Sequence, residues 1–461
     1  MSFQKSRGKI FFFLCAFLAI VFFQNCGQHG FQSRLPSSLK QTDANQNAEL
    51  NLPSEDVGDV DLSGIKDIPS TQQIEDISAV NSSAIIASIS TTSLISTAPN
   101  PGKKIYYVAT SGNDGNPGTI TKPFRTLARG SRAMASGDTL YVRAGTYSEF
   151  GPALRNGTAS AYTRYVAYPR EERKVIIKPP LTSGNLNVVY FPDNAEYIEF
   201  RGFVVDGINV ERGYGIKGIK KSRVINNVVR NAGMGLGGGR ESLIVGNEVY
   251  NMSDYGIYTG SGDNGVVEGN IFHHCGGFGI HHYKSGGGVN NWTFRNNVIY
   301  RTGRLYYHYL TGDKIRTSPA VIISSGRYNK FYNNIIYDNH GGISVAYGAV
   351  DSLIANNTVY ANDTTGINVS GANSGSLRAR IVNNIVFANK GTTITNTGTS
   401  TTIQNNLTVD PKFVSASSRN FRLQAGSPAI DKGLKLLEVP KDFLNVTRPR
   451  GKAYDIGAYE Y

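Results

Sequence analysis

The sequence predicts an all-β solenoid, in which short strands wind into stacked coils, and three observations lead to this prediction. The chain has 52 glycines and 26 tyrosines but one tryptophan and four methionines, which suits tight turns and strand surfaces better than helix bundles. An asparagine followed by a short, mostly apolar run recurs eight times along the second half of the chain. The recurrences lie at uneven intervals of 20 to 37 residues. A solenoid tolerates such variation because each coil can extrude a loop while its strands stay in register.

The recurring asparagine marks one bend of each coil. A strand precedes it ("SLIVG", "GVVEG"), an apolar strand follows it ("VIY", "IIY"), and a third strand begins with a small residue ("GIYTG", "GISVA"). Three short strands and three bends per coil are typical of a right-handed parallel β-helix. The alternative is an antiparallel sandwich whose hairpin turns carry the "NN" pairs, but eight recurrences with the same flanks disfavour it. The reference positions are Asn227, Asn247, Asn270, Asn297, Asn334, Asn357, Asn384 and Asn406.

Stacking gives a physical reason for these asparagines. Successive coils lie about 4.8 Å apart, so the side-chain amide of each asparagine can donate to the side-chain carbonyl one coil away. Such a column satisfies polar groups buried along the axis, and asparagine also tolerates the left-handed backbone that a tight bend requires. The apolar positions should stack in the same way. One interior column is predicted to contain Ile257, Ile280, Val321, Ile343 and Ile367.

The first 26 residues have the plan of an export signal. Lys5, Arg7 and Lys9 precede an apolar stretch over 10–23, which is shorter than the roughly 18 to 20 residues that span a bilayer. Cys26 follows this stretch and resembles the lipobox cysteine of bacterial lipoproteins, which is lipidated and becomes the first residue. The alternative is an ordinary secretion signal or an uncleaved anchor. Either way we expect an exported protein.

Residues 27–102 are rich in polar side chains and poor in aromatic ones. Such a segment cannot bury enough surface to offset its chain entropy, so we expect a disordered tether. With Cys26 acylated, Cys275 is alone in the mature chain and cannot form an internal disulfide. We expect it to be a small apolar filler.

Residues 103–461 are predicted to form the β-helix domain. Over 103–150, "IYYVA" and "TLYVRAG" are strand-like, and "PFRTLARGSRAMA" has helical spacing with proline at its start. This passage resembles the N-terminal cap of secreted proteins of the pectate-lyase-like superfamily, in which a short helix closes the end of the coil. Over 409–461, "SPAIDKG" and "DIGAYEY" are similar to the irregular C-terminal cap of these proteins. The resemblance implies that this cap packs over the last coil and protects its edge.

The resemblance also implies that substrate lies along the outside of one parallel sheet. Alternation along the third strand then places Tyr258, His281 and Tyr283 on one outer face, with Lys284 at the rim. Aromatic faces suit sugar rings, and cations suit carboxylates or sulfates. The full outward series is Lys217, Gly237, Tyr258, His281, Ile322, Ser344 and Asn368. A loop in the 37-residue interval beside this sheet adds Tyr306, Tyr307, His308, Tyr309, Asp313, Lys314 and Arg316. We expect the sugar contacts at Tyr258, Tyr283, Tyr306, Tyr307, His308 and Lys217.

A lyase acting on a uronic acid needs a base, a cation that neutralises the carboxylate and a proton donor for the leaving oxygen. Related lyases use lysine or arginine as the base. Lys314 or Lys284 is therefore the candidate base, Arg316 the candidate neutralising cation, and His281 or a nearby tyrosine the candidate proton donor. Solvated surface cations are the alternative interpretation. Hydrolysis would require two acids facing the groove, and paired-aspartate motifs are absent from the sequence.

No cofactor is clearly indicated, although related lyases often use calcium. Asp254, Asp263 and Glu268 fall on neighbouring turns, but they do not recur at one position of the coil, as a ligand cluster would. In the histidine-rich stretch, His281 should point outward and His282 inward, while His273 and His274 lie on another strand. We therefore expect no transition-metal site.

The net charge of +13 favours an anionic partner. The cations are scattered without a dense run, which argues against nucleic acid. We expect a monomer held by its lipid anchor at the bacterial outer membrane or cell surface, with periplasmic or secreted protein as the alternative. It should bind an anionic polysaccharide and, if catalytic, cleave it by β-elimination. The competing hypothesis is a non-catalytic surface protein that binds carbohydrate or acts as an adhesive stalk.

Overall fold

A computed structural model describes residues 98–461, except 181–186, 286–287, 305–316 and 373 and the side chains of 208–212. The predicted signal peptide, Cys26 and nearly all of the predicted tether lie outside the described residues. Within the described ranges, no helix is long and apolar enough to cross a membrane.

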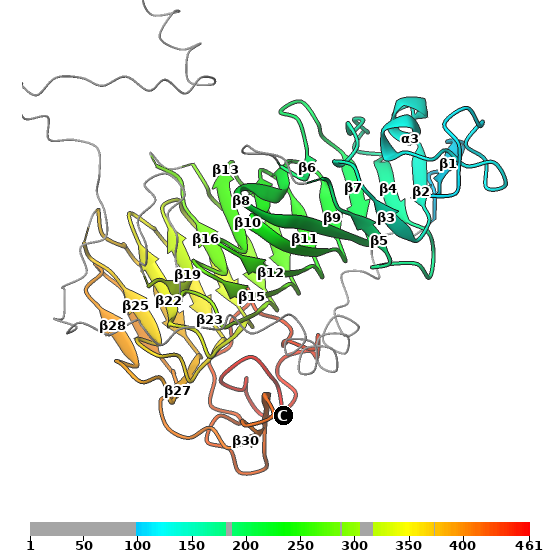
Figure 1. Cartoon of the computed structure of the whole chain (residues 1–461). Helices are drawn as coiled ribbons and strands as arrows, with labels where there is room; N and C mark the ends of the chain where they lie inside the picture. Colours follow the sequence, from blue (N-terminus) through cyan, green and yellow to red (C-terminus); the bar gives the residue numbers. More distant parts are fainter. Residues whose placement is uncertain (1–97, 181–186, 286–287, 305–316, 373) are drawn as a thin grey trace, which may run out of the picture. The chain divides into compact units, whose positions relative to one another are not determined.

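The described chain forms three parallel sheets that follow one another around a solenoid (Figure 1), and this confirms the predicted parallel β-helix. Each short strand pairs with its counterparts in the previous and next coils. Sheet 1 contains β1 (Ile105–Val108), β2 (Thr139–Val142), β4 (Thr163–Ala167), β7 (Ile198–Arg201), β9 (Arg223–Ile225), β11 (Leu243–Val245), β14 (Val266–Glu268), β17 (Thr293–Arg295), β20 (Lys330–Tyr332), β23 (Leu353–Ala355), β26 (Arg380–Val382) and β29 (Thr402–Gln404).

Sheets 2 and 3 follow sheet 1 in each coil, and the long strands β8 and β10 run through the bend between them. Sheet 2 contains β3 (Gly145–Tyr147), β5 (Val175–Ile177), the first parts of β8 (Phe203–Ile219) and β10 (Val228–Gly239), β12 (Glu248–Met252), β15 (Ile271–Cys275), β18 (Val298–Tyr300), β21 (Ile335–Tyr337), β24 (Thr358–Tyr360) and β27 (Ile385–Phe387). Sheet 3 contains β6 (Val189–Tyr190), the later parts of β8 and β10, β13 (Ile257–Ser261), β16 (Ile280–His282), β19 (Pro319–Ser324), β22 (Gly341–Ala346), β25 (Ile367–Val369) and β28 (Ile394–Asn396).

The eight predicted asparagines form a single file at the bend between sheets 1 and 2. From Asn227 to Asn384, each side-chain Nδ2 donates to the Oδ1 of the asparagine in the next coil, at 2.9–3.0 Å. The same Oδ1 also accepts the backbone N–H of the preceding asparagine, as in the bond from Asn270 to Asn297. The ladder therefore satisfies buried backbone and side-chain groups together, as predicted.

The two residues of each "NN" pair have different roles. The left-handed backbone belongs to the residue before the ladder asparagine, such as Asn333 (φ 54°) or Gly246 (φ 65°), and not to the ladder asparagine itself. The side chain of this preceding residue, where it is an asparagine, points away from the ladder. In the later coils it donates to the C-terminal segment, as Asn333 does to the carbonyl of Lys441 and Asn356 to that of Asp455.

The predicted interior column of sheet 3 is also confirmed. Ile257 pairs with Ile280, Ile280 with Val321, and the series continues through Ile343 to Ile367. All five side chains belong to the main hydrophobic core. Cys275 lies in the same core as a buried free thiol, as predicted.

The predicted N-terminal helix is present as α3 (Leu127–Ala133), beside β1 and β2 (Figure 1). Thr126 caps it by accepting the N–H of Arg129. Leu127 enters the main core, and Gly130 lies against the side chains of Val108 and Leu140, where a Cβ would come within 3 Å of each.

The C-terminal segment lies against the flank of the solenoid, and the prediction that it packs over the last coil is wrong. Phe421 and Phe443 pack with Tyr337 on the outer face of sheet 2. Over residues 436–454 the same segment covers apolar side chains of sheet 1. Ile403, which continues the inward-facing positions into β29, is 41% exposed. The outer faces of sheets 1 and 2 carry apolar rows, and burying these rows favours the side of the rod over its end. The segment also contains the hairpin of β30 (Phe413–Ser415) and β31 (Asn420–Leu423).

Candidate functional site

The outer face of sheet 3 carries the predicted outward series. Tyr258 on β13 pairs with His281 on β16, His281 with Ile322 on β19, and the series continues through Ser344 to Asn368. Side chains of a parallel strand alternate between its two faces, so the inward column of isoleucines fixes this outward one. The register therefore places these residues as the sequence predicted.

Aromatic rings from three coils gather on this face. The His281 ring lies 4.5 Å from that of Tyr255, 4.6 Å from that of Phe278 and 5.1 Å from that of Tyr258, centroid to centroid. Tyr283 lies 5.9 Å from His281 and 6.1 Å from Tyr347, which extends the group towards the later coils. Phe278 is buried, and the other five rings are partly exposed. We call the six residues Tyr255, Tyr258, Phe278, His281, Tyr283 and Tyr347 the aromatic platform.

Glycines beside the platform let its rings lie close to the sheet. A Cβ at Gly260 would stand 2.5 Å from the ring of Tyr258, and one at Gly237 would stand 3.2 Å from the ring of Tyr214. The ammonium of Lys217 lies 5.4 Å from the centroid of the Tyr214 ring. Lys217 is exposed and continues the outward series beyond Gly237. One end of the platform therefore has an exposed cation, as predicted.

Lys284 lies at the other rim of the platform. It follows Tyr283, its side chain is exposed, and its backbone N–H donates to Oγ of Ser325 at 3.0 Å. The structure thus brings Tyr258, His281, Tyr283 and Lys284 together as the sequence predicted. Tyr306, Tyr307, His308, Tyr309, Asp313, Lys314 and Arg316 lie outside the described residues, so their predicted roles stay predictions.

Burial lowers the pKa of His281 to about 3, and the neighbouring His282 adds to this effect. The imidazole is therefore neutral at physiological pH, which disfavours His281 as the proton donor that the sequence suggested. Its Nδ1 is buried and has no hydrogen-bond partner among the described residues. His281 is better placed as a ring that packs among the tyrosines of the platform.

The other histidines belong to the interior or to another face, as predicted. His282 is fully buried, with Nδ1 at 2.8 Å from Thr259 Oγ1 and Nε2 at 3.2 Å from the carbonyl of Val289. His273, on sheet 2, stacks between Tyr250 and Tyr300 with centroids 4.8 Å from each. The histidines therefore do not converge on one point.

Asp254 lies beside the platform as a buried carboxyl group. From the sequence, it was considered only as a possible calcium ligand. It precedes Tyr255 of the platform, its side chain is 2% exposed, and neither carboxylate oxygen has a partner in the described chain. Burial raises its pKa to about 8, so the carboxyl is largely protonated at neutral pH. Gly233 and Gly277 occupy the same place in the flanking coils, where the backbone of Asp254 bonds to both. The sequence signal for this buried carboxyl is that an aspartate occupies a position of the coil where both flanking coils have glycine.

The three carboxylates considered for calcium have separate environments. Asp263 accepts the backbone N–H of Asn290 at 2.7 Å, and Glu268 pairs with Arg295 at 2.9 Å. No group of three histidine, cysteine, aspartate or glutamate side chains in the described ranges is arranged to hold a metal ion.

Comparison with known proteins concerns mainly the fold. The family model described as "Right handed beta helix region" matches residues 189–315 and 300–408, in agreement with the predicted handedness. An uncharacterized protein of Bacillus subtilis (strain 168), YwoF, is 42% identical over 65 residues. That match spans 14% of this chain and 14% of the relative's length.

Solved structures of the same architecture include the pectate lyase Pel9A. It shares 18% identity with a TM-score of 0.55, and the match covers 80% of this chain and 98% of that one. The lacto-N-biosidase from Eubacterium ramulus is 13% identical with a TM-score of 0.47, over 66% of this chain and 68% of that one. At 18% identity, the likeness to Pel9A shows the fold alone and leaves the function to the site.

Proposed function

We propose that this protein binds an anionic polysaccharide along the outer face of sheet 3. Sugar rings would lie against the aromatic platform, and their carboxylates would face Lys217 and Lys284. The observation that carries the proposal is the platform itself, in which six aromatic residues from three coils lie together and five of them, His281 included, are partly exposed. The pectate lyase Pel9A, which has the same fold, supports pectate as the first polymer to test.

The chemistry of the face matches this class of ligand. Tyrosine rings offer large apolar faces together with a hydroxyl that can bond to sugar oxygens. Lysine ammonium groups attract carboxylates or sulfates and steer a charged polymer, and the net charge of +13 acts in the same direction. The glycines at 237 and 260 let the rings of Tyr214 and Tyr258 lie close against the sheet.

We propose β-elimination as the reaction if the protein is an enzyme. The base takes the proton α to the uronate carboxylate, a carbon–carbon double bond forms, the glycosidic bond at the β carbon breaks, and the leaving oxygen takes a proton. Lys284 at the rim is the candidate base within the described residues, and Tyr258 is the candidate proton donor. Lys314 is the alternative base, and Arg316 is the candidate cation for the carboxylate.

A polymer panel tests both binding and cleavage. The purified protein is run through native gels that contain polygalacturonate, alginate, chondroitin or a neutral galactan, and each polymer solution is also followed for the ultraviolet absorbance of unsaturated sugars. We expect retardation by at least one anionic polymer and none by galactan. Retardation without new absorbance, with calcium present or chelated, favours the adhesive or binding protein over the lyase. Equal mobility in all gels contradicts the proposal.

Variants connect binding to the platform. Tyr258→Ala should weaken polymer binding about tenfold, because a stacked ring contributes on the order of 1 kcal/mol beyond its buried area. The matched control is Tyr461→Ala, at a tyrosine that is 51% exposed and remote from sheet 3 in sequence. An equal loss in both variants contradicts a role of the platform.

We also propose that residues 1–26 export the protein and that Cys26 carries a lipid anchor. Fractionation of cells that express the wild-type chain and the Cys26→Ala variant tests this. Wild-type protein is expected in the membrane fraction and the variant in the soluble exported fraction. An unchanged distribution contradicts lipid anchoring.

A further inference from the structure

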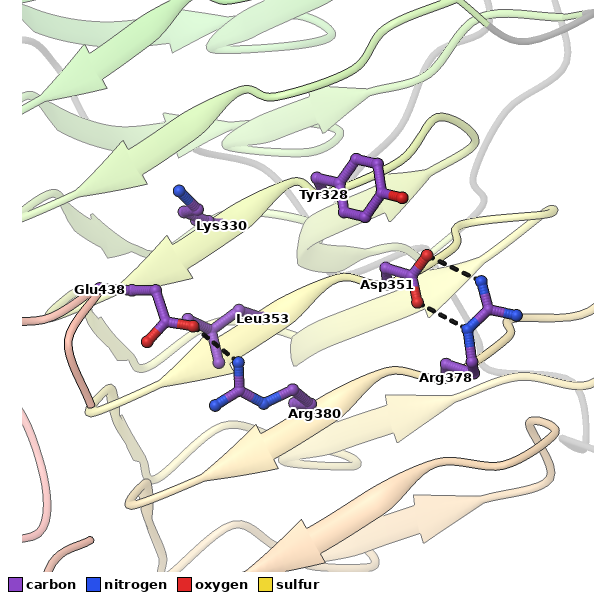
Figure 2. Close-up of a pocket in the computed structure, with 7 residues that line it drawn as sticks. All are labelled: Tyr328, Lys330, Asp351, Leu353, Arg378, Arg380 and Glu438. Atoms are coloured by element: carbon purple, nitrogen blue, oxygen red, sulfur yellow. Dashed lines mark hydrogen bonds and ion pairs between the residues drawn. The ribbon is translucent and has the colours of Figure 1, made fainter. Parts of the chain in front are cut away.

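A pocket of about 460 Å³ opens on sheet 1, away from the aromatic platform. Its floor is Leu353 on β23, and its charged walls stand on both sides of that residue (Figure 2). Glu438 closes one side from the C-terminal segment. The pocket therefore exists because that segment folds back along the flank.

The lining follows from the coil repeat. Lys330, Leu353 and Arg380 are register partners on β20, β23 and β26, and they form one row across three coils. Tyr328, Asp351 and Arg378 form a second row at the preceding bend, with left-handed φ values of 59°, 54° and 53°. Neighbouring coils lie about 4.8 Å apart, so the two rows place six side chains on a regular grid.

Most of the charges in this grid are already paired. Arg378 holds Asp351 through two bonds of 2.7 and 2.8 Å, and Arg380 holds Glu438 at 2.7 Å (Figure 2). The side-chain ammonium of Lys330 has no hydrogen bond or ion pair to any residue that the structure describes, although its charge helps to lower the pKa of Glu438. Three cations thus face two carboxylates, and the surplus charge lies on the Lys330 ammonium.

Tyr328 adds an aromatic surface at the edge of the pocket. It is 50% exposed, so its ring can be reached from solvent. A left-handed backbone is uncommon for a bulky residue, and here the bend imposes it. The ring stands beside the Asp351–Arg378 pair (Figure 2).

We propose that this pocket is a second carbohydrate site, which binds a uronate residue with its carboxylate on Lys330 and its ring against Tyr328. The paired carboxylates and guanidinium groups offer both acceptors and donors, as sugar hydroxyls require. A sulfate ion has only acceptors to offer, and it would meet Asp351 and Glu438 with like charge. This inference rests on the proposed function only for the choice of a uronate as the ligand. Two sites on different faces let one polymer bind with increased avidity.

Titration calorimetry with galacturonate trisaccharide, a ligand short enough to report each site separately, tests the proposal. Wild-type protein should bind two trisaccharides, and the Tyr258→Ala variant should keep one site at wild-type affinity while its platform site binds about tenfold more weakly. Adding Lys330→Met to Tyr258→Ala should weaken the remaining site at least tenfold, because it removes a charge-assisted contact and keeps the aliphatic stem. Adding Lys122→Met, at an exposed lysine of the N-terminal region, should change nothing.

Hydrogen exchange checks where the trisaccharide binds. Trisaccharide bound to Tyr258→Ala should slow amide exchange over 434–439, since Glu438 lines the site. Absence of residual binding in Tyr258→Ala, or residual binding that neither Lys330→Met nor Tyr328→Ala weakens, overturns the inference. Binding that Lys330→Met removes and Tyr258→Ala leaves intact supports this site and contradicts the proposed function of the platform.

Discussion

The bend between sheets 1 and 2 and the bend between sheets 2 and 3 stack their coils in different ways. At the first bend, asparagine recurs from Asn227 to Asn406, and each member bonds to the next. At the second bend the inward residues change along the rod. They are Ala232, Met252 and Cys275 in the early coils, followed by Thr302, Asn339, Asn362 and Asn389 in the later ones. The later four form a second, shorter ladder, with Asn339 donating to Asn362 at 3.0 Å.

The comparison shows that the bend between sheets 1 and 2 holds the coils together, whereas the bend between sheets 2 and 3 varies along the rod. An uninterrupted ladder gives every coil the same bend between sheets 1 and 2. Where the second bend is apolar, the following strands β13 and β16 carry Tyr258 and His281 of the platform. The uniform bend is thus structural, and the variable one lies next to the candidate site.

Breaking the uniform ladder should have the largest effect. The side chain of Asn297 makes four hydrogen bonds, to the backbone N–H and Nδ2 of Asn270, the carbonyl of Val267 and Oδ1 of Asn334. Asn297→Leu leaves these buried groups without partners, and we expect a loss of about 4 kcal/mol in the free energy of unfolding by denaturant titration. Asn396→Leu, at an exposed position of β28, should cost under about 1 kcal/mol. Similar losses for both variants contradict the role of the ladder.

Asp254 should make stability fall with rising pH. Its folded-state pKa of about 8 lies above the ordinary value of 3.8, so the folded state holds a proton that the unfolded state releases between these values. Stability contributed by this proton is present below about pH 4 and is lost as the pH rises to about 8. Asp254→Asn should therefore be more stable than wild type by on the order of 3 kcal/mol at pH 8.

The control for this prediction is the same pair of proteins at pH 4, where the difference in unfolding free energy should be small. Buried His281 and His282 have lowered pKa values and oppose the trend in wild type, but their contribution cancels in the comparison. A difference that stays constant from pH 4 to 8 contradicts the raised pKa of Asp254.

An amide side chain placed in the apolar half of the second bend should lower the free energy of unfolding. Cys275→Asn places a buried amide beside Met252, which offers only a weak acceptor, and we expect a loss of about 2 kcal/mol in unfolding free energy. Cys275→Ala should cost about 1 kcal/mol, since it removes only packing contacts. An asparagine variant more stable than the alanine variant would show that the ladder can extend into these coils.

The smallest effect concerns the first residue of the "NN" pair. Asn356→Gly keeps the left-handed backbone and removes three hydrogen bonds: two that Asn356 donates to the carbonyls of Asp455 and Gly457, and one that it accepts from Nδ2 of Asn383. We expect a loss of about 1 kcal/mol and faster proteolysis near the C-terminus. Gly246→Asn, in a coil that this segment does not reach in the described contacts, should be neutral within about 0.5 kcal/mol. Equal effects of the two variants contradict the tethering role.

The parts of the molecule that repeat were predictable from the sequence. The ladder, the interior isoleucine column and the outward series with Tyr258 and His281 all follow from one rule of stacking, so position in the coil decides orientation. Lys284 was placed at the rim for the same reason.

The parts that depend on non-repeating contacts were not predictable. The C-terminal segment was expected over the last coil, but its fit against Tyr337 and Leu353 depends on side chains far away in sequence. The pocket of Figure 2 needs Glu438 from that segment, so no local sequence motif could have predicted it. The low pKa of His281 likewise comes from burial by several coils together.

A crystal structure of the protein with bound galacturonate oligosaccharide tests the central claim most directly. The account predicts sugar rings on the outer face of sheet 3, stacked on Tyr258 or Tyr283, with a carboxylate within hydrogen-bond distance of Lys217 or Lys284. An oligosaccharide bound elsewhere, with the aromatic platform bare at saturating ligand, would contradict it.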